Sequence, residues 1–130
     1  MKLLLRERGS DEARALWNTG DIVVVSWITF TEASAALGAA VRAGRITPAE
    51  MKIHRSRLVR AWRSVTAIDA DGSVAAAAAR LALSHRLRGM DAIHLATALI
   101  VRRARPVLVT WDEDLARAAT EEGLSVAGAA

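Results

Sequence analysis

The chain has no cysteine and no tyrosine, and only two prolines and one phenylalanine among its 130 residues. Without cysteine it can form neither a disulfide framework nor a thiolate site, so disulfide-stabilised scaffolds and cysteine catalysis are excluded. Long apolar runs are also missing, because no stretch approaches the ~18–20 residues that cross a membrane. The amino terminus is charged from Lys2 onward, which argues against a signal peptide. We therefore expect a soluble, cytoplasmic protein.

The composition is that of a folded domain with a basic surface. Hydrophobic residues make up 52% of the chain and charged residues 25%, which argues against disorder. A length of 130 residues corresponds to about one domain, and no linker or internal repeat interrupts it, so residues 1–130 are predicted to form a single domain. The net charge of +4 and a pI near 10.9 favour an acidic partner, either nucleic acid or an acidic protein.

Apolar patterning predicts that strands and helices alternate along the chain. Strands are predicted at 22–25, 65–68, 106–110 and 124–127. Helices are predicted at 3–17 with a break at Gly9 and a cap at Ser10, and then at about 26–42, 48–62, 73–84, 91–103 and 112–122. Thr47, Pro48 and Glu50 form the capping-box pattern that starts the helix at 48. Continuous apolar strands between helices predict a parallel sheet buried on both faces, as in an α/β architecture.

Three acidic residues stand at element junctions. Glu32 follows the first predicted strand, Asp112 follows the third, and Asp91 starts an apolar-periodic helix. Ligands of parallel α/β sheets bind beyond the carboxyl ends of the strands, where these acids could converge. Oxygen-rich clusters of this kind bind Mg²⁺ or Mn²⁺.

Each acid also has a purely structural interpretation. Asp91 and Asp112 stand where helix N-caps are favoured, and an N-cap aspartate is as good an explanation as a metal ligand. Glu32 lies among small and apolar residues, where an unpaired carboxylate would be costly, and this favours a functional role. Asp114 is better explained as a first-turn acid, although it stays a secondary candidate. His94 is interpreted as a packed residue and not as a catalyst.

Two further groups of residues have structural interpretations. The arginines between 55 and 63 are typical of a solvated helix face, with phosphate contacts as the alternative. The four tryptophans are scattered in the sequence, which indicates core packing and predicts no stacking platform.

Three segments together resemble the PIN domain, in particular the small VapC-type ribonuclease toxins of prokaryotic toxin–antitoxin pairs. They are residues 25–32 (VSWITFTE), 91–98 (DAIHLATA) and 109–115 (VTWDEDL), which occur in the family's order. The resemblance extends over nearly the whole chain. It implies a PIN-like three-layer α/β/α sandwich with a parallel sheet.

The resemblance also implies an activity and its partners. PIN-type toxins are endoribonucleases that depend on Mg²⁺ or Mn²⁺ and cleave RNA phosphodiesters. By motif match, Glu32, Asp91 and Asp112 correspond to the family's second, third and fourth metal-binding acids. Family members bind a cognate antitoxin and a second toxin copy through helix surfaces. Because the helices predicted at 3–17 and 48–62 carry additional apolar residues, we expect a homodimer that also binds an antitoxin.

The chain departs from the family at its amino terminus. The family opens with a central strand that ends in its first catalytic aspartate, and the sequence from Met1 to Gly9 supplies no equivalent. Asp11 lies further along, where the family has its next helix, so the role of the first acid is not assigned to it. We expect the chain as given to be a weak or inactive ribonuclease. Adding an amino-terminal strand that ends in aspartate is expected to increase both its stability and its activity.

The departure leaves a second function open. A chain without the first acid could be an inactive PIN-domain remnant that acts only by binding an antitoxin or RNA. A phosphatase or nucleotide-binding protein is disfavoured, because no glycine-rich phosphate loop is present.

Overall fold

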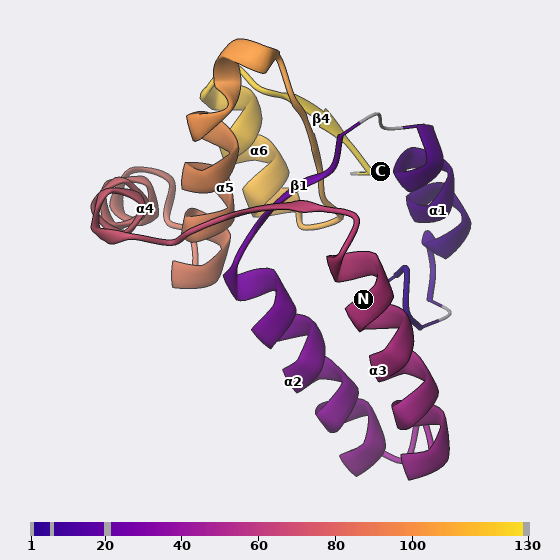
Figure 1. The fold of residues 1–130 in the computed structure, drawn as a ribbon. Coiled ribbons are helices and arrows are strands. Elements are labelled where there is room, and N and C mark those ends of the chain that lie inside the picture. Colours follow the sequence, from indigo (N-terminus) through magenta and orange to yellow (C-terminus); the bar gives the residue numbers. More distant parts are fainter. Residues whose placement is uncertain (1, 6, 20–21, 129–130) are drawn as a thin grey trace. The chain divides into compact units, whose positions relative to one another are not determined.

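The computed structural model describes residues 2–5, 7–19 and 22–128. The helices are α1 (Ser10–Thr19), α2 (Ile28–Arg42), α3 (Pro48–Trp62), α4 (Gly72–His85), α5 (Gly89–Ile100) and α6 (Glu113–Glu121), with a 3₁₀ turn η1 (Arg102–Ala104) (Figure 1). The strands are β1 (Val24–Ser26), β2 (Thr66–Ile68), β3 (Val107–Val109) and β4 (Ser125–Ala127). The chain divides into two compact units. Unit 1 comprises Met1–Val23 and Trp27–Thr66, and unit 2 comprises Val24–Ser26 and Ala67–Ala130.

Unit 1 is helical, and α2 and α3 pack side by side in it (Figure 1). Its core contains Leu5, Leu37, Ala40 and Leu58, all less than a tenth exposed. The start of α3 is set by the predicted capping box. The Thr47 hydroxyl accepts a hydrogen bond from the Glu50 backbone N–H at 3.2 Å, and a Glu50 carboxylate oxygen accepts one from the Thr47 N–H at 2.8 Å. These bonds satisfy two backbone donors that the first turn of a helix leaves unpaired.

Unit 2 contains β1, β3, β4 and all of β2 except Thr66, and it is centred on α5. This helix packs against α4, α6 and β1, and Leu95 and Ala92 on it are fully buried. β3 and β4 form a parallel pair in which Val107 aligns with Ser125. β1 and β2 form a second, separate two-stranded sheet. The chain therefore has the predicted α/β architecture with short strands.

A charged contact joins α4 to α6 in unit 2. The ring of His85 lies between two carboxylates, with Nδ1 2.9 Å from Glu121 and Nε2 2.7 Å from Glu122. Its side chain is only 11% exposed. The hydrogen bond to Glu122 and then that to Glu121 raise the pKa of His85 above its ordinary value of 6.5, against the opposing effect of burial. Arg117 also donates to the carbonyl oxygen of His85 at 3.2 Å, which reinforces the junction.

Several predicted elements need correction. Residues 2–5 form turns and not a helix, and Ser10 is the first residue of α1 and not its cap. The Ser10 hydroxyl instead donates to the Leu5 carbonyl at 3.1 Å and accepts from the Glu7 N–H at 2.9 Å, which ties the turn to the helix. The strand predicted at 106–110 is present as β3, but its predicted full burial is wrong, since Val107 is 55% exposed and Val109 44% exposed. Across the described ranges, no helix is long and apolar enough to cross a membrane.

Candidate functional site

Asp112 is held by the turn between β3 and α6. It is the N-cap of α6, and its Oδ1 accepts a hydrogen bond from the Leu115 backbone N–H at 2.9 Å. Thr110, which is 8% exposed, orients the same residue because its hydroxyl oxygen accepts from the Asp112 N–H at 3.1 Å. The N-cap interpretation of Asp112 is therefore confirmed. Because a carboxylate has several acceptor positions, capping leaves the second oxygen available for another ligand.

The backbone at Gly128 lies close to the turn that carries Asp112. Gly128 has a positive φ of 92°, and a Cβ there would lie 2.8 Å from the Thr110 carbonyl oxygen and about 3.0 Å from the ring of Trp111. The Thr110 N–H donates to the Ala127 carbonyl at 2.9 Å, which extends the β3–β4 pairing by one bond. Only glycine fits at 128 without moving the turn that carries Asp112.

Asp91 lies in the first turn of α5 and is half-buried. The N-cap interpretation of this residue is wrong, because α5 begins at Gly89 and its N-cap is Arg88. The predicted start of this helix was two residues too late. A carboxylate in the first turn is still stabilised by the positive end of the helix dipole. Asp91 is thus a first-turn acid of α5 and not its N-cap.

The first turns of α5 and α6 lie at the same end of unit 2. Figure 1 shows that α5 runs up to η1, that β3 returns in the opposite direction, and that α6 begins where β3 ends. β1 packs against α5, and the strand runs towards the end of unit 2 at which that helix begins (Figure 1). This end of unit 2 is the carboxyl edge of β1 and β3, where α/β folds bind their ligands.

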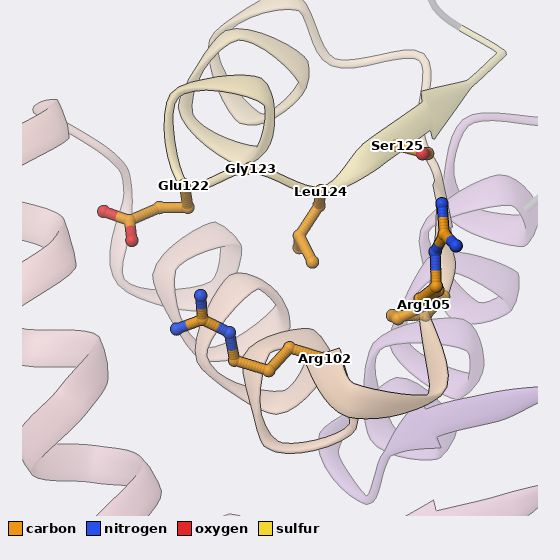
Figure 2. Close-up of a pocket in the computed structure, with 7 residues that line it drawn as sticks. Arg102, Arg105, Glu122, Gly123, Leu124 and Ser125 are labelled. Atoms are coloured by element: carbon orange, nitrogen blue, oxygen red, sulfur yellow. The ribbon is translucent and has the colours of Figure 1, made fainter.

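A pocket of about 210 Å³ lies at the opposite end of unit 2. Arg102, Arg105 and Glu122 line it, together with the segment from Gly123 to Ser125 that leads into β4 (Figure 2). The pocket therefore sits at the amino edge of β3 and β4, away from Asp112.

Glu32 lies in α2 and is half-buried. It belongs to unit 1, whereas Asp91 and Asp112 belong to unit 2, so the convergence of the three acids stays a prediction. Over the residues that the structure describes, no group of three or more Asp, Glu or His side chains is placed to hold a metal ion. Asp114 is 77% exposed and lies 3.5 Å from Arg117, as the first-turn interpretation predicted.

The groups at this edge of unit 2 have the chemistry that a hydrated divalent cation requires. Asp91 and Asp112 offer carboxylate oxygens, the donors that Mg²⁺ and Mn²⁺ prefer. Ser26 is 1% exposed, and its hydroxyl has no hydrogen-bond partner within the described parts of the chain. A buried hydroxyl without a partner costs free energy, and such groups commonly bind ordered water or a ligand. The oxygen donors of Asp91 and Asp112 are thus of the type that a hydrated divalent cation takes.

The interpretation of the tryptophans as core residues is wrong for Trp27, which is 50% exposed, and two of the four tryptophans meet in a cluster. The rings of Trp27 and Trp62 meet edge to face with centroids 5.4 Å apart, and the Phe30 ring lies 5.1 Å from Trp62. All three belong to unit 1, and Trp27 is 50% exposed. Sequence spacing could not reveal this cluster, because it depends on how α2 and α3 pack. A partial signal was the placement of Trp27 and Phe30 one helical turn apart.

Comparison with known proteins agrees with the motifs. Residues 1–121 match the PIN domain family. The chain is 36% identical over 129 residues to ribonuclease VapC45 of Mycobacterium tuberculosis strain CDC 1551 / Oshkosh, a match that covers 99% of this chain and 90% of the relative. It has the same identity and coverage with ribonuclease VapC49 of M. tuberculosis strain ATCC 25618 / H37Rv.

Proposed function

Since the chain belongs to the PIN domain family, we propose that it is a metal-dependent endoribonuclease and the toxin of a type II toxin–antitoxin pair. The observation that carries this proposal is the 36% identity, over 99% of the chain, to proteins named as VapC ribonucleases. The acids that match the family's motifs support it, because Asp91 and Asp112 start neighbouring helices at one edge of unit 2.

In this proposal Glu32, Asp91 and Asp112 hold Mg²⁺ or Mn²⁺. When bound, the ion lowers the pKa of a coordinated water and neutralises charge on the scissile phosphate. Asp112 offers the carboxylate oxygen that capping leaves available, and the hydrogen bond to Thr110 fixes the backbone of the acid. Asp91 adds a second carboxylate from the first turn of α5. The net charge of +4 attracts the RNA.

The proposed partners are an RNA substrate, a cognate antitoxin and a second copy of the chain in the cytoplasm. Exposed apolar side chains in unit 1 support a protein–protein interface, since Leu3 is 37% exposed and Ile53 is 55% exposed. Light scattering across micromolar concentrations tests the homodimer, and a purely monomeric species at all of them would count against it.

The alternative function is that of an inactive PIN-domain remnant that binds an antitoxin or RNA without cleaving it. In the motif match, residues are assigned to the family's second, third and fourth acids and none to the first. Removing one of several carboxylate ligands weakens a metal site and misplaces the attacking water.

A cleavage assay separates the two functions. Single-stranded RNA is incubated with the purified chain in Mg²⁺, in Mn²⁺ and in EDTA. We expect cleavage only with metal, and expect Asp91→Asn to lower the rate by about 10²-fold or more, the usual cost of losing one electrostatic stabiliser of a transition state. Asp69→Asn is the matched control, because Asp69 is an exposed acid in the turn before α4. Cleavage that survives EDTA or Asp91→Asn would contradict the proposal, and RNA binding without any cleavage would favour the alternative.

A further inference from the structure

A groove in unit 1 lies along one face of α3. It has a volume of about 350 Å³ and is lined by Arg55, Ser56, Val59, Arg60 and Arg63. Because an α-helix turns by about 100° per residue, these five positions fall within an arc of about 140°. The last of them is the C-cap of α3 and keeps a right-handed helical backbone, so the same periodicity extends to it. The three arginines therefore share one face of a single helix.

The charged residues on this face of α3 are all positive. Lys52 falls on the same arc, one turn before the groove, and it is exposed, as are the three arginines. The one acid of α3 is Glu50, which lies about 150° around the helix from the middle of the arc. Its Oε2 accepts hydrogen bonds of 2.8 Å from the backbone N–H and the hydroxyl of Thr47. Glu50 is thus engaged in capping and does not neutralise the groove.

No ion pair compensates these charges. In the part of the chain that the structure describes, neither Lys52 nor any groove arginine pairs with a carboxylate, whereas Arg14, Arg45 and Arg117 do. Like charges three residues apart on a helix repel each other, as Lys52 and Arg55 do, and an anionic ligand relieves that repulsion.

The dipole of α3 explains only part of this pattern. It favours cations in the last turn of a helix, which accounts for Arg60 and Arg63. The effect falls off within one turn, so it does not account for Arg55 or Lys52, which lie earlier in α3. A ligand that interacts with the whole face accounts for all four.

The charge and the length of the groove favour the backbone of a nucleic acid. Arg55 and Arg63 are about 12 Å apart along the helix axis, at a rise of ~1.5 Å per residue. A nucleic-acid strand that rises ~3.4 Å per nucleotide places about three phosphates over that length. The groove lining contains one apolar side chain, the half-buried Val59. A protein partner is disfavoured, because the core of a protein interface is depleted in charge and built on apolar anchors.

We propose that Arg55, Arg60 and Arg63 form a phosphate-binding groove on α3 that holds the backbone of single-stranded RNA. Each guanidinium contacts a phosphate through its forked N–H donors. These contacts do not read the bases, so the groove binds RNA of any sequence. The inference rests on the proposed function, because it gives the RNA substrate a binding surface on the unit that carries Glu32.

Binding without cleavage tests the groove directly. The full chain is titrated in EDTA, over a range of salt concentrations, into a fluorescently labelled oligouridine of roughly 12 nucleotides. Replacing Arg55, Arg60 and Arg63 together by glutamine, which retains a high helix propensity, removes three charges. The slope of log K against log salt should fall by about 2, the contribution of three single-strand phosphate contacts. Between about 50 and 200 mM salt, the wild type should then lose about 20-fold more affinity than the variant.

A matched control lies on the same helix. Arg57 is exposed and lies about 130° around α3 from the middle of the groove arc. Arg60→Gln should lower the salt slope by about 0.7, whereas Arg57→Gln removes the same charge and should leave most of the slope in place. An oligonucleotide of mixed sequence should give the same differences as oligouridine. Thermal melting of each variant checks that α3 stays folded.

The outcomes separate this inference from the proposed function. Unchanged RNA affinity and salt slope in the triple variant, with metal-dependent cleavage intact, would overturn the groove alone. Equal effects of Arg57→Gln and Arg60→Gln would indicate diffuse attraction by net charge and would also overturn it. So would loss of the dimer in light scattering with unchanged RNA affinity, because that result assigns the arginines to a protein interface.

Two results bear on the proposed function as well. The expected loss of salt slope in a chain that binds RNA but never cleaves it would support the groove while the nuclease proposal fails. A wild-type chain that neither binds nor cleaves RNA would overturn both.

Discussion

The backbone N–H of Asp112 donates to the hydroxyl oxygen of Thr110 at 3.1 Å, so a buried side chain at the end of β3 fixes the acid that caps α6. Asp112 in turn accepts from Leu115, and the two bonds make one continuous turn from strand to helix. The stability of this turn and the placement of the candidate metal ligand are therefore linked.

Replacing Thr110 tests that link. Thr110→Val keeps the shape of the buried side chain but removes the acceptor, which leaves a part-buried N–H unpaired. We expect a loss of about 1–3 kcal/mol in the free energy of unfolding, measured by urea denaturation, together with weaker Mn²⁺ binding by calorimetry. Thr110→Ser is the control, since it keeps the oxygen and should bind metal like the wild type. Equal Mn²⁺ affinity in all three proteins would show that the bond does not position the acid.

Gly128→Ala is predicted to destabilise the same turn, because residue 128 lies against Thr110. The new Cβ would lie 2.8 Å from the Thr110 carbonyl oxygen at a φ of 92°. A strained backbone of this kind costs about 1–3 kcal/mol, and the close contact adds to it. Gly44→Ala is a matched control, because φ there is also positive, at 66°, with nothing within 4 Å of the added carbon. A melting temperature for Gly128→Ala as high as that of Gly44→Ala would contradict the prediction.

The His85 contact predicts a pH dependence of stability. Its folded pKa is raised by Glu122 and Glu121, so protonated His85 stabilises unit 2 fully below its unfolded pKa of 6.5, and this contribution is lost as pH rises through the higher folded pKa. His85 in turn lowers the pKa of Glu121 below 4.5, so that carboxylate stabilises the fold above 4.5 and loses its effect as pH falls through its folded pKa. Melting temperatures should therefore be highest between about pH 4.5 and pH 6.5.

His85→Gln tests this interpretation, because glutamine can donate hydrogen bonds but does not titrate in this range. The decline of melting temperature above pH 6.5 should become shallower in the variant than in the wild type. Parallel pH profiles for the two proteins would mean that another group is responsible.

An amino-terminal extension tests the interpretation of the chain's first residues. β1 pairs with β2 and β3 with β4, and among the described residues no ladder joins the two sheets. An added apolar strand that ends in aspartate is expected to raise both the melting temperature and metal-dependent cleavage, because burying each apolar side chain contributes about 1.5–3 kcal/mol. Equal stability and equal cleavage with and without the extension would show that the alignment of the amino terminus is wrong.

Local chemistry in the sequence was enough to predict most elements. The capping box at Thr47 and Glu50 and the N-cap at Asp112 act within one turn, so residue types at short spacing determine where those helices start. Each of the three segments that resemble the PIN domain is likewise an unbroken stretch of sequence. The family that they indicated is confirmed. The burial of β3 was predicted wrongly, because apolar character alone does not say what covers a strand.

Packing between segments that are distant in sequence decided which side chains meet. His85 and Glu121 are 36 residues apart, and only the contact between α4 and α6 brings their side chains within 2.9 Å. The edge-to-face pair of Trp27 and Trp62 likewise exists because α2 and α3 pack together. The sequence by itself determined the family, the starts of α3 and α6 and the acids available for chemistry, since these depend on residue identity and local spacing. The tertiary structure decided which distant side chains meet and which stay exposed, because those contacts follow from the burial of apolar surface by the folded chain as a whole.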